Sequence, residues 1–210
     1  MKLKSLMALA IALLCSAGAW AQTDVTSTYI TNADFSGERT EYALPSGNTS
    51  LASDRRIYQP EGWNIAVKNK NQYNYSVVKL GDKLQTTDFN SDPYKPTDGK
   101  YMVRFRNGNS DSEHITLSQT FTIDIPGIYT FSAYLIRENG SKIDVTLSAA
   151  GGSVSNSSAG TWQNQSFDVT ITKETEVTVT LKFANKATSG DNKCRAGADD
   201  VKIYLNSATL

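Results

Sequence analysis

The sequence predicts an all-β protein that folds as an antiparallel β-sandwich of the jelly-roll type. Apolar and polar residues alternate over many short runs, as they do in strands that bury one face. Turn-forming residues separate these runs, and no segment after residue 22 has the period of an amphipathic helix. Seven or more short strands at this spacing indicate a sandwich or a barrel, and of these we expect the sandwich.

The strands are expected where the alternation is strongest, beginning with the run from Ile115 to Ile123. Thr, Val, Ile and Tyr dominate these runs, as they do in half-buried sheets. Further sets with a period of two are expected to face the core: Trp63, Ile65 and Val67; Tyr101, Val103 and Phe105; Tyr129 and Phe131; Ile143, Val145 and Leu147; Phe167, Val169 and Ile171; Val177, Val179, Leu181 and Phe183; and Val201, Ile203 and Leu205. Trp162 is expected in the core as well.

Three segments interrupt the alternation. Residues 37–61 and 81–99 are rich in Gly, Ser, Pro and charged residues and are expected to be long loops, which are often functional or disordered. Residues 150–160 are rich in Gly and Ser and are expected to form a flexible hairpin connection.

Residues 1–21 have the features of a secretory signal peptide that is cleaved. Lys2 and Lys4 precede an apolar run that is too short to span a bilayer, and Ala19 and Ala21 stand at the positions that a signal peptidase reads. We therefore expect an exported protein, periplasmic, extracellular or attached to the cell surface, without membrane insertion. Residues 22–210 are expected to form one jelly-roll domain.

The composition of the expected mature chain excludes some partners. Lys2 and Lys4 leave with the signal, so 19 basic and 21 acidic side chains remain and the formal charge is −2 (19 minus 21). A nearly neutral surface without basic blocks argues against nucleic acid and against electrostatic binding to an anionic membrane. Cys194 is the one remaining cysteine, so the chain forms no internal disulfide.

Several short motifs occur in order between residues 30 and 204. They are Asn32 to Phe35 with Gly62-Trp63, Asp98 to Tyr101, Leu117 to Phe121, Pro126 to Ser132, Thr161-Trp162 with Phe167, and Ala198 to Ile203. Together they resemble the pattern of galactose-binding-like jelly rolls, a group that includes the carbohydrate-binding modules of glycoside hydrolases. The resemblance implies the fold and suggests carbohydrate binding, although this scaffold hosts many functions.

The resemblance also implies one structural Ca²⁺ where the first and last strands meet. Asp199 shares the alternation of Val201 and Ile203, so it is expected to point inward, where a carboxylate needs partners. Asn32, Asp34 or Ser36 would supply oxygen ligands from the first strand. Ser36 stands where the family often has an acid. The alternative is that Asp199 accepts hydrogen bonds from backbone amides of the first strand.

Two surfaces are candidates for sugar binding, because sugar rings stack on aromatic side chains and their hydroxyls bond to polar groups. One is the outer sheet face that carries Tyr134, Arg104 and Arg106; the alternative is an ordinary solvated face with extended arginines. The other is the long loops, in or beside which tyrosines are interleaved with Asn and Asp. These tyrosines are Tyr58, Tyr73, Tyr75 and Tyr94.

Catalysis has little support in the sequence, and we do not expect an enzyme. His114 is the only histidine, and no serine lies in a nucleophile-elbow pattern. Three functions stay open. A carbohydrate-binding protein is favoured and predicts exposed aromatic residues. A surface or assembly component that binds protein partners predicts an unprotected edge strand or an apolar patch. A glycoside hydrolase predicts two carboxylates in one cleft.

Overall fold

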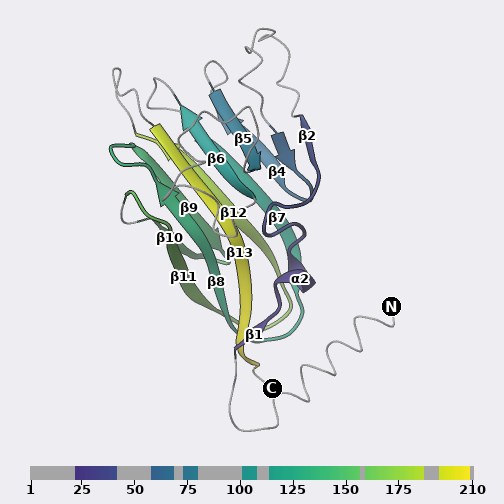
Figure 1. Cartoon of the computed structure of the whole chain (residues 1–210). Coiled ribbons are helices and arrows are strands. Elements are labelled where there is room, and N and C mark those ends of the chain that lie inside the picture. The colour runs from purple at the N-terminus through teal and green to yellow at the C-terminus, as the bar shows by residue number, and fades with distance from the viewer. Residues whose placement is uncertain are drawn as a thin grey trace.

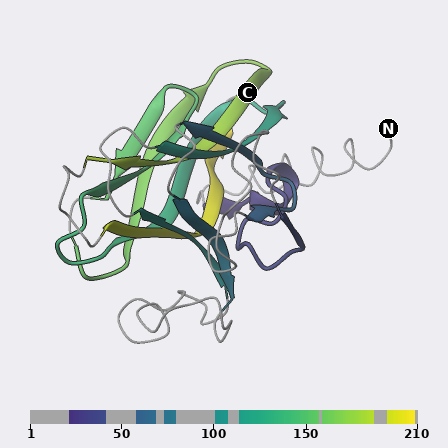
Figure 2. The same ribbon diagram turned by 90° about the horizontal axis from the view of Figure 1, so that it is seen from above.

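The computed structural model describes residues 22–41, 58–68, 73–79, 101–107, 114–156, 159–186 and 194–208. These residues form two antiparallel sheets that face each other as the layers of a β-sandwich (Figures 1 and 2). Beyond β6, successive strands mostly alternate between the two sheets, which is the connectivity of a jelly roll. The predicted fold class is therefore confirmed.

The front sheet has the order β11 (Gln163–Ile171), β8 (Gly127–Arg137), β13 (Cys194–Ala208), β6 (Tyr101–Asn107) and β5 (Tyr73–Lys79), with β1 (Thr23–Asp24) paired to the end of β13. The back sheet has the order β10 (Gly152–Ser155), β9 (Ile143–Ala149), β12 (Thr175–Asn185), β7 (His114–Ile123) and β4 (Asn64–Lys68). A small ladder joins β2 (Arg39–Glu41) to β3 (Tyr58–Pro60), and the short helix α2 covers Thr26–Tyr29. Within the described ranges, no helix has the length and apolar character that crossing a membrane requires.

The core lies between the inner faces of the two sheets, at the positions that the alternation predicts. Phe105 of β6 meets Phe183 of β12 across the sandwich, with their ring centroids 6.0 Å apart. Trp63 is fully buried, as expected, whereas Trp162 is only half-buried. Val169 and Phe167 are also half-buried because β11 is an edge strand. The period of two thus located the described part of the core, but it did not distinguish central strands from edge strands; the side chains of Tyr101 and Val67, also expected in the core, lie outside the described residues.

The segment 150–160 differs from its prediction. Ala150 and Gly151 alone make the turn, both with positive φ (46° and 85°), as in a tight type I′ hairpin. The chain then continues as β10, which pairs with β9 from Gly152 to Ser155. A Cβ on Gly152 would lie 2.4 Å from the Phe167 ring, so glycine lets β10 pack closely on β11.

The N-terminal segment, residues 22–37, lies along β13 and is held by backbone bonds and by one buried amide. Val25 N donates to Ile203 O (2.9 Å), and Ile203 N donates to the Thr26 hydroxyl (2.9 Å). On the other side, Gln119 of β7 accepts from Thr31 N (3.0 Å) and donates to Thr31 O (2.6 Å). The Gln119 side chain thus satisfies both backbone groups of Thr31, as a neighbouring strand would.

We predict that Gln119→Met lowers the free energy of unfolding by about 1 to 3 kcal/mol, because it keeps the side-chain volume but removes both bonds to Thr31. Urea unfolding measures this loss. Gln165→Met is the matched control, since Gln165 is half-buried and bonds within the described residues to the Gln163 side chain, not to the backbone of a distant segment. Equal losses in the two variants would contradict the prediction.

Candidate functional site

A β-bulge in β13 determines which side chains reach the outer face of the front sheet. Asp199 pairs with Tyr134 and Lys202 pairs with Ser132, so Asp200 and Val201 together stand opposite one residue of β8, Ala133. The extra residue reverses the alternation. Ala198 and Val201 are both in the core, and Asp199 shares the outer face with Tyr134. The predicted inward orientation of Asp199 is therefore wrong.

The bulge is stabilised from its own strand and from the N-terminal segment. Asp200 has a φ of 49°, a conformation that Asp tolerates better than most residues. Its amide donates to Asp199 Oδ1 (2.8 Å), and Val201 N donates to Ala33 O (3.0 Å). Asp199 is only 1% exposed. Its carboxylate therefore accepts a backbone amide of its own strand, whereas the alternative to calcium expected amides of the first strand.

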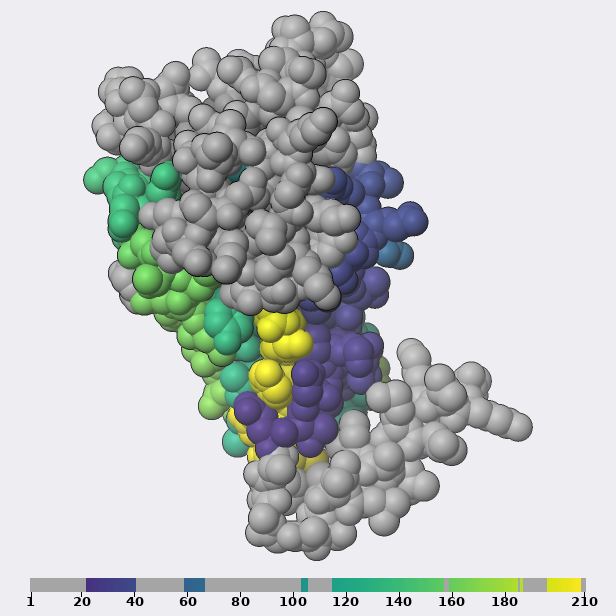
Figure 3. All heavy atoms as spheres, viewed as in Figure 1, coloured from purple at the N-terminus to yellow at the C-terminus, as the bar shows by residue number. Residues whose placement is uncertain are grey.

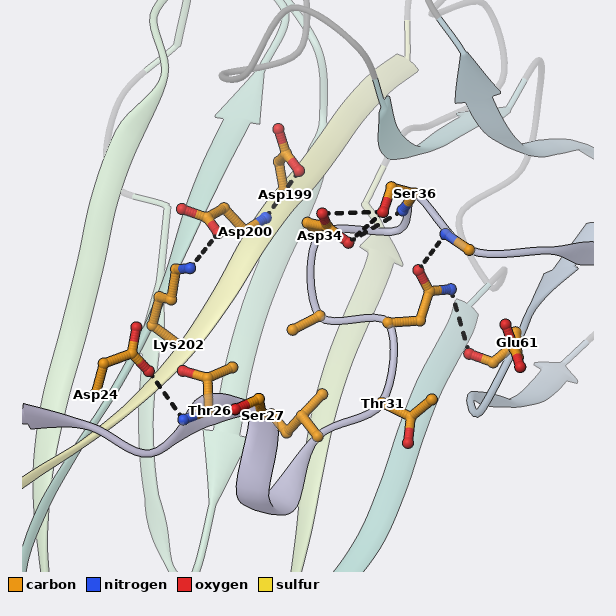
Figure 4. Close-up of a pocket in the computed structure, with 14 residues that line it drawn as sticks. Asp24, Thr26, Ser27, Thr31, Asp34, Ser36, Glu61, Asp199, Asp200 and Lys202 are labelled. Atoms are coloured by element: carbon orange, nitrogen blue, oxygen red, sulfur yellow. Dashed lines mark hydrogen bonds and ion pairs between the residues drawn. The ribbon is translucent and has the colours of Figure 1, made fainter.

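A pocket of about 620 Å³ opens between the bulge and the N-terminal segment. Its walls carry five carboxylates and one ammonium group, from Asp24, Asp34, Glu61, Asp199, Asp200 and Lys202 (Figure 4). Lys202 Nζ lies 3.0 Å from Asp200 Oδ1. Burial opposes the charge on Lys202, but the hydrogen bond and charge of Asp200, with the charge of Asp24, raise its pKa above the ordinary value. The pocket is thus acidic and keeps its single lysine protonated.

The motif residues that suggested the fold support the loop that lines this pocket. Phe35 has a φ of 57°, which is unusual for an aromatic residue, and its ring is fully buried against Trp63 at 5.4 Å. Trp63 Nε1 donates to Asn32 O (3.0 Å). Gly62 has a φ of 78°, and a Cβ there would lie 2.9 Å from the Thr31 side chain. These four motif residues, Asn32, Phe35, Gly62 and Trp63, therefore hold the loop in shape.

The residues expected to bind calcium all line the pocket, but their side-chain oxygens are already engaged. Asp34 accepts from the Ser36 hydroxyl (2.8 and 3.0 Å) and from Ser36 N (3.2 Å), and Asn32 Oδ1 accepts from Gly37 N (2.7 Å). In the described part of the chain, no three His, Cys, Asp or Glu side chains are grouped as metal ligands. The pocket has the oxygen chemistry that Ca²⁺ needs. The ion stays a prediction from the resemblance.

The predicted sugar-binding residues are only partly brought together. Tyr134 lies on the outer face, as expected, but it is half-buried. Arg104 pairs with Gly197 on the same face, but it is 4% exposed, so the expected exposed arginine at this position is wrong. Arg106 belongs to β6 and Tyr75 to β5, where its backbone pairs with Phe105, so Tyr75 is not in a loop. The side chains of Arg106 and Tyr75, and all of Tyr94, lie outside the described residues.

Tyr204 is a site residue that the sequence analysis did not select. It lies on the outer face opposite Thr130 and beside Asp24 of β1. Burial, the Asp24 carboxylate and, more weakly, Tyr134 raise its pKa. The sequence could have indicated Tyr204, because it lies between Ile203 and Leu205, which are buried, and therefore faces outward. Six outward-facing residues of β8 and β13 form a surface that we call the outer strip. They are Thr130, Ser132, Tyr134, Asp200, Lys202 and Tyr204.

The outer strip is ordered by hydrogen bonds at one end and flanked by the pocket at its side. The Thr130 hydroxyl donates to Asp168 Oδ1 (2.6 Å) and accepts from Asn206 Nδ2 (2.7 Å), while Gln22 donates to Asn206 Oδ1 (2.9 Å). In the space-filling view, this part of β13 reaches the surface between β8 and the N-terminal segment (Figure 3). Ser132 is 4% exposed, and the other five strip residues are half-buried, so the strip joins aromatic and hydrogen-bonding side chains on a partly accessible surface.

No protein-family model matches the chain, and no curated protein sequence matches it significantly. Several solved structures are similar to it. One is a family 61 carbohydrate-binding module in complex with β-1,4-galactotriose, 18% identical over 69% of this chain and 89% of that one, with a TM-score of 0.49. The second is the family 22 xylan-binding domain 22-1 of Xyn10C from Paenibacillus barcinonensis, 14% identical over 71% and 88% of the two chains (TM-score 0.40). A family 4 carbohydrate-binding module is 15% identical over 86% and 99% (TM-score 0.42). All three are similar to this chain in their sandwich fold.

The calcium prediction is tested by thermal unfolding with added Ca²⁺ and with chelator. It expects Ca²⁺ to raise the melting temperature and Asp34→Asn to abolish that rise, because ligand binding to the native state stabilises it. Asp168→Asn, on β11 away from the pocket, is the control that keeps the rise. A melting temperature that is the same with Ca²⁺ and with chelator would contradict the prediction.

Proposed function

We propose that the protein is exported and binds glycans without catalysing a reaction, and that the ligand lies on the outer strip. The observation that carries this proposal is the arrangement of Tyr134 and Tyr204. Tyr204 lies opposite Thr130, four residues from Tyr134 along β8, so the two tyrosines are about 13 Å apart along the strands, with Ser132 and Lys202 midway between them.

This spacing suits an extended ligand with more than one sugar ring. Each tyrosine offers an apolar ring for the C–H face of a sugar, and its hydroxyl can bond at the same time. Lys202 and Asp200, both half-buried, then supply donors and acceptors for sugar hydroxyls between the two rings. Because strands carry all six residues, the rings are held on a rigid support, which limits the entropy lost on binding.

We expect the protein to bind a related set of oligosaccharides on a glycan array. Tyr134→Ala and Tyr204→Ala should each weaken binding roughly tenfold, because each removes one stacking surface. Tyr134→Phe keeps the ring and should lose less than Tyr134→Ala. Titration of one array ligand by calorimetry measures these affinities.

Lysine provides the matched control for the site. Lys202→Ala should weaken binding, whereas Lys182→Ala, at an exposed position on the outer face of the back sheet, should leave it unchanged. Equal effects of Lys202→Ala and Lys182→Ala would exclude the outer strip as the binding surface. Full binding by the double variant Tyr134→Ala/Tyr204→Ala would exclude it as well.

The acidic pocket favours one further candidate, a glycoside hydrolase, since such enzymes act through two carboxylates. Our proposal predicts that prolonged incubation with a bound oligosaccharide produces no new reducing ends. Their appearance in the wild type, and their loss in Asp200→Asn, would replace the binding function with hydrolysis.

A further inference from the structure

At one end of the front sheet lies β11, whose outer edge is open within the described residues. Its nine residues pair continuously with β8, from Gln163 opposite Leu135 to Ile171 opposite Gly127, without a register shift. Within the described part of the chain, no strand pairs with its other side. Alternate backbone N–H and C=O groups of β11 therefore point away from the sheet. Long, regular edges of this kind are templates for another strand.

β11 lacks the features that commonly block an edge. It contains no lysine, no proline and no bulge, and Asp168 is its only charged residue. Its inner face also retains exposed apolar surface. Phe167 stacks on Phe131 with centroids 5.8 Å apart, yet Phe167 and Val169 are only half-buried, as is Val154 on the adjacent β10. A further strand along β11 would cover this surface.

We propose that β11 pairs antiparallel with β11 of a second copy of this protein, about a twofold axis at Phe167, so that two front sheets become one continuous sheet. In this register the two Phe167 residues are opposite each other on the inner face. On the outer face, Ser166 of each copy lies opposite Asp168 of the other.

The chemistry of the exposed side chains favours this register. Ser166 can donate to the Asp168 carboxylate of the second copy, whose Oδ1 already accepts from Thr130 within its own chain. Asn164 faces Thr170, and all four of these side chains are exposed. An axis at Asp168 would instead place two carboxylates opposite each other, which is unfavourable. An axis at Ser166 would place Asn164 opposite Asp168. Charge variants at Ser166 and at Asn164 distinguish this register from the one with the axis at Phe167.

A second copy is the occupant because the same edge supplies both halves of the contact, as in isologous dimers. A single pair of nine-residue strands buries little area, so the association is weak and depends on concentration. The twofold axis is perpendicular to the sheets, so both outer strips face the same side. This arrangement would let one glycan chain contact two sites. That consequence rests on the proposed function, but the association of the two copies does not rest on it.

Sedimentation equilibrium tests the proposal at protein concentrations from about 1 µM to 1 mM. The sample is the full chain in the form that its cell produces, without glycan. We expect the mass to rise from monomer to dimer. Ser166→Lys creates two Lys–Asp pairs across the axis and should tighten the dimer roughly 3- to 30-fold. Ser166→Asp creates two like-charge pairs and should weaken it by a similar factor.

The controls carry the same charges elsewhere on the protein. Asn164→Lys and Asn164→Asp face the uncharged Thr170, and Thr178→Lys lies in the middle of the back sheet, so none of the three should change the association. The tightening by Ser166→Lys cannot result from unfolding, which keeps the test valid if Ser166→Asp is unstable. A monomer at every concentration would overturn the proposal. A charge response at Asn164 instead of Ser166 would overturn the register at Phe167.

Discussion

The structure depends on how the backbone of β13 is satisfied beyond Ala198. Up to that residue β13 is a central strand, paired with β8 on one side and β6 on the other. β6 contributes no further pairs, although β13 continues with buried residues such as Val201 and Ile203. Buried backbone groups must be paired, so another segment has to replace β6. The N-terminal segment does so through Ala33, Thr26, Val25 and finally β1.

This replacement also creates the candidate site. The backbone bonds hold the N-terminal segment at Val25 and at Ala33, and the residues between and around these points stand opposite the β13 bulge. The pocket is the space that remains between the two. Gln119 and the buried pair of Phe35 and Trp63 keep the segment from collapsing into it. The fold and the site therefore have the same physical origin.

The bulge separates two environments on neighbouring surfaces. On one side of β13, the pocket concentrates carboxylates around Lys202. On the other side, the outer strip carries the two tyrosines together with the uncharged Ser132 and Thr130. A ligand on the strip would meet the two tyrosines and, between them, Lys202 with its ion-pair partner Asp200. Because Asp200 and Lys202 belong to both surfaces, their ion pair links the electrostatics of the pocket to the strip.

The sequence by itself determined the strands, the two-layer sandwich and most of the core, because burying one face of each strand imposes a period of two that local composition records. It also identified Trp63 as a core residue and Tyr134 as facing outward. Only the tertiary structure decided the direction of Asp199, since one inserted residue at Asp200 reverses the alternation without any signal in hydrophobicity. The same holds for the burial of Arg104 and for Tyr204 as a site residue. Burial and proximity are set by segments far apart in the chain, which a local pattern does not contain.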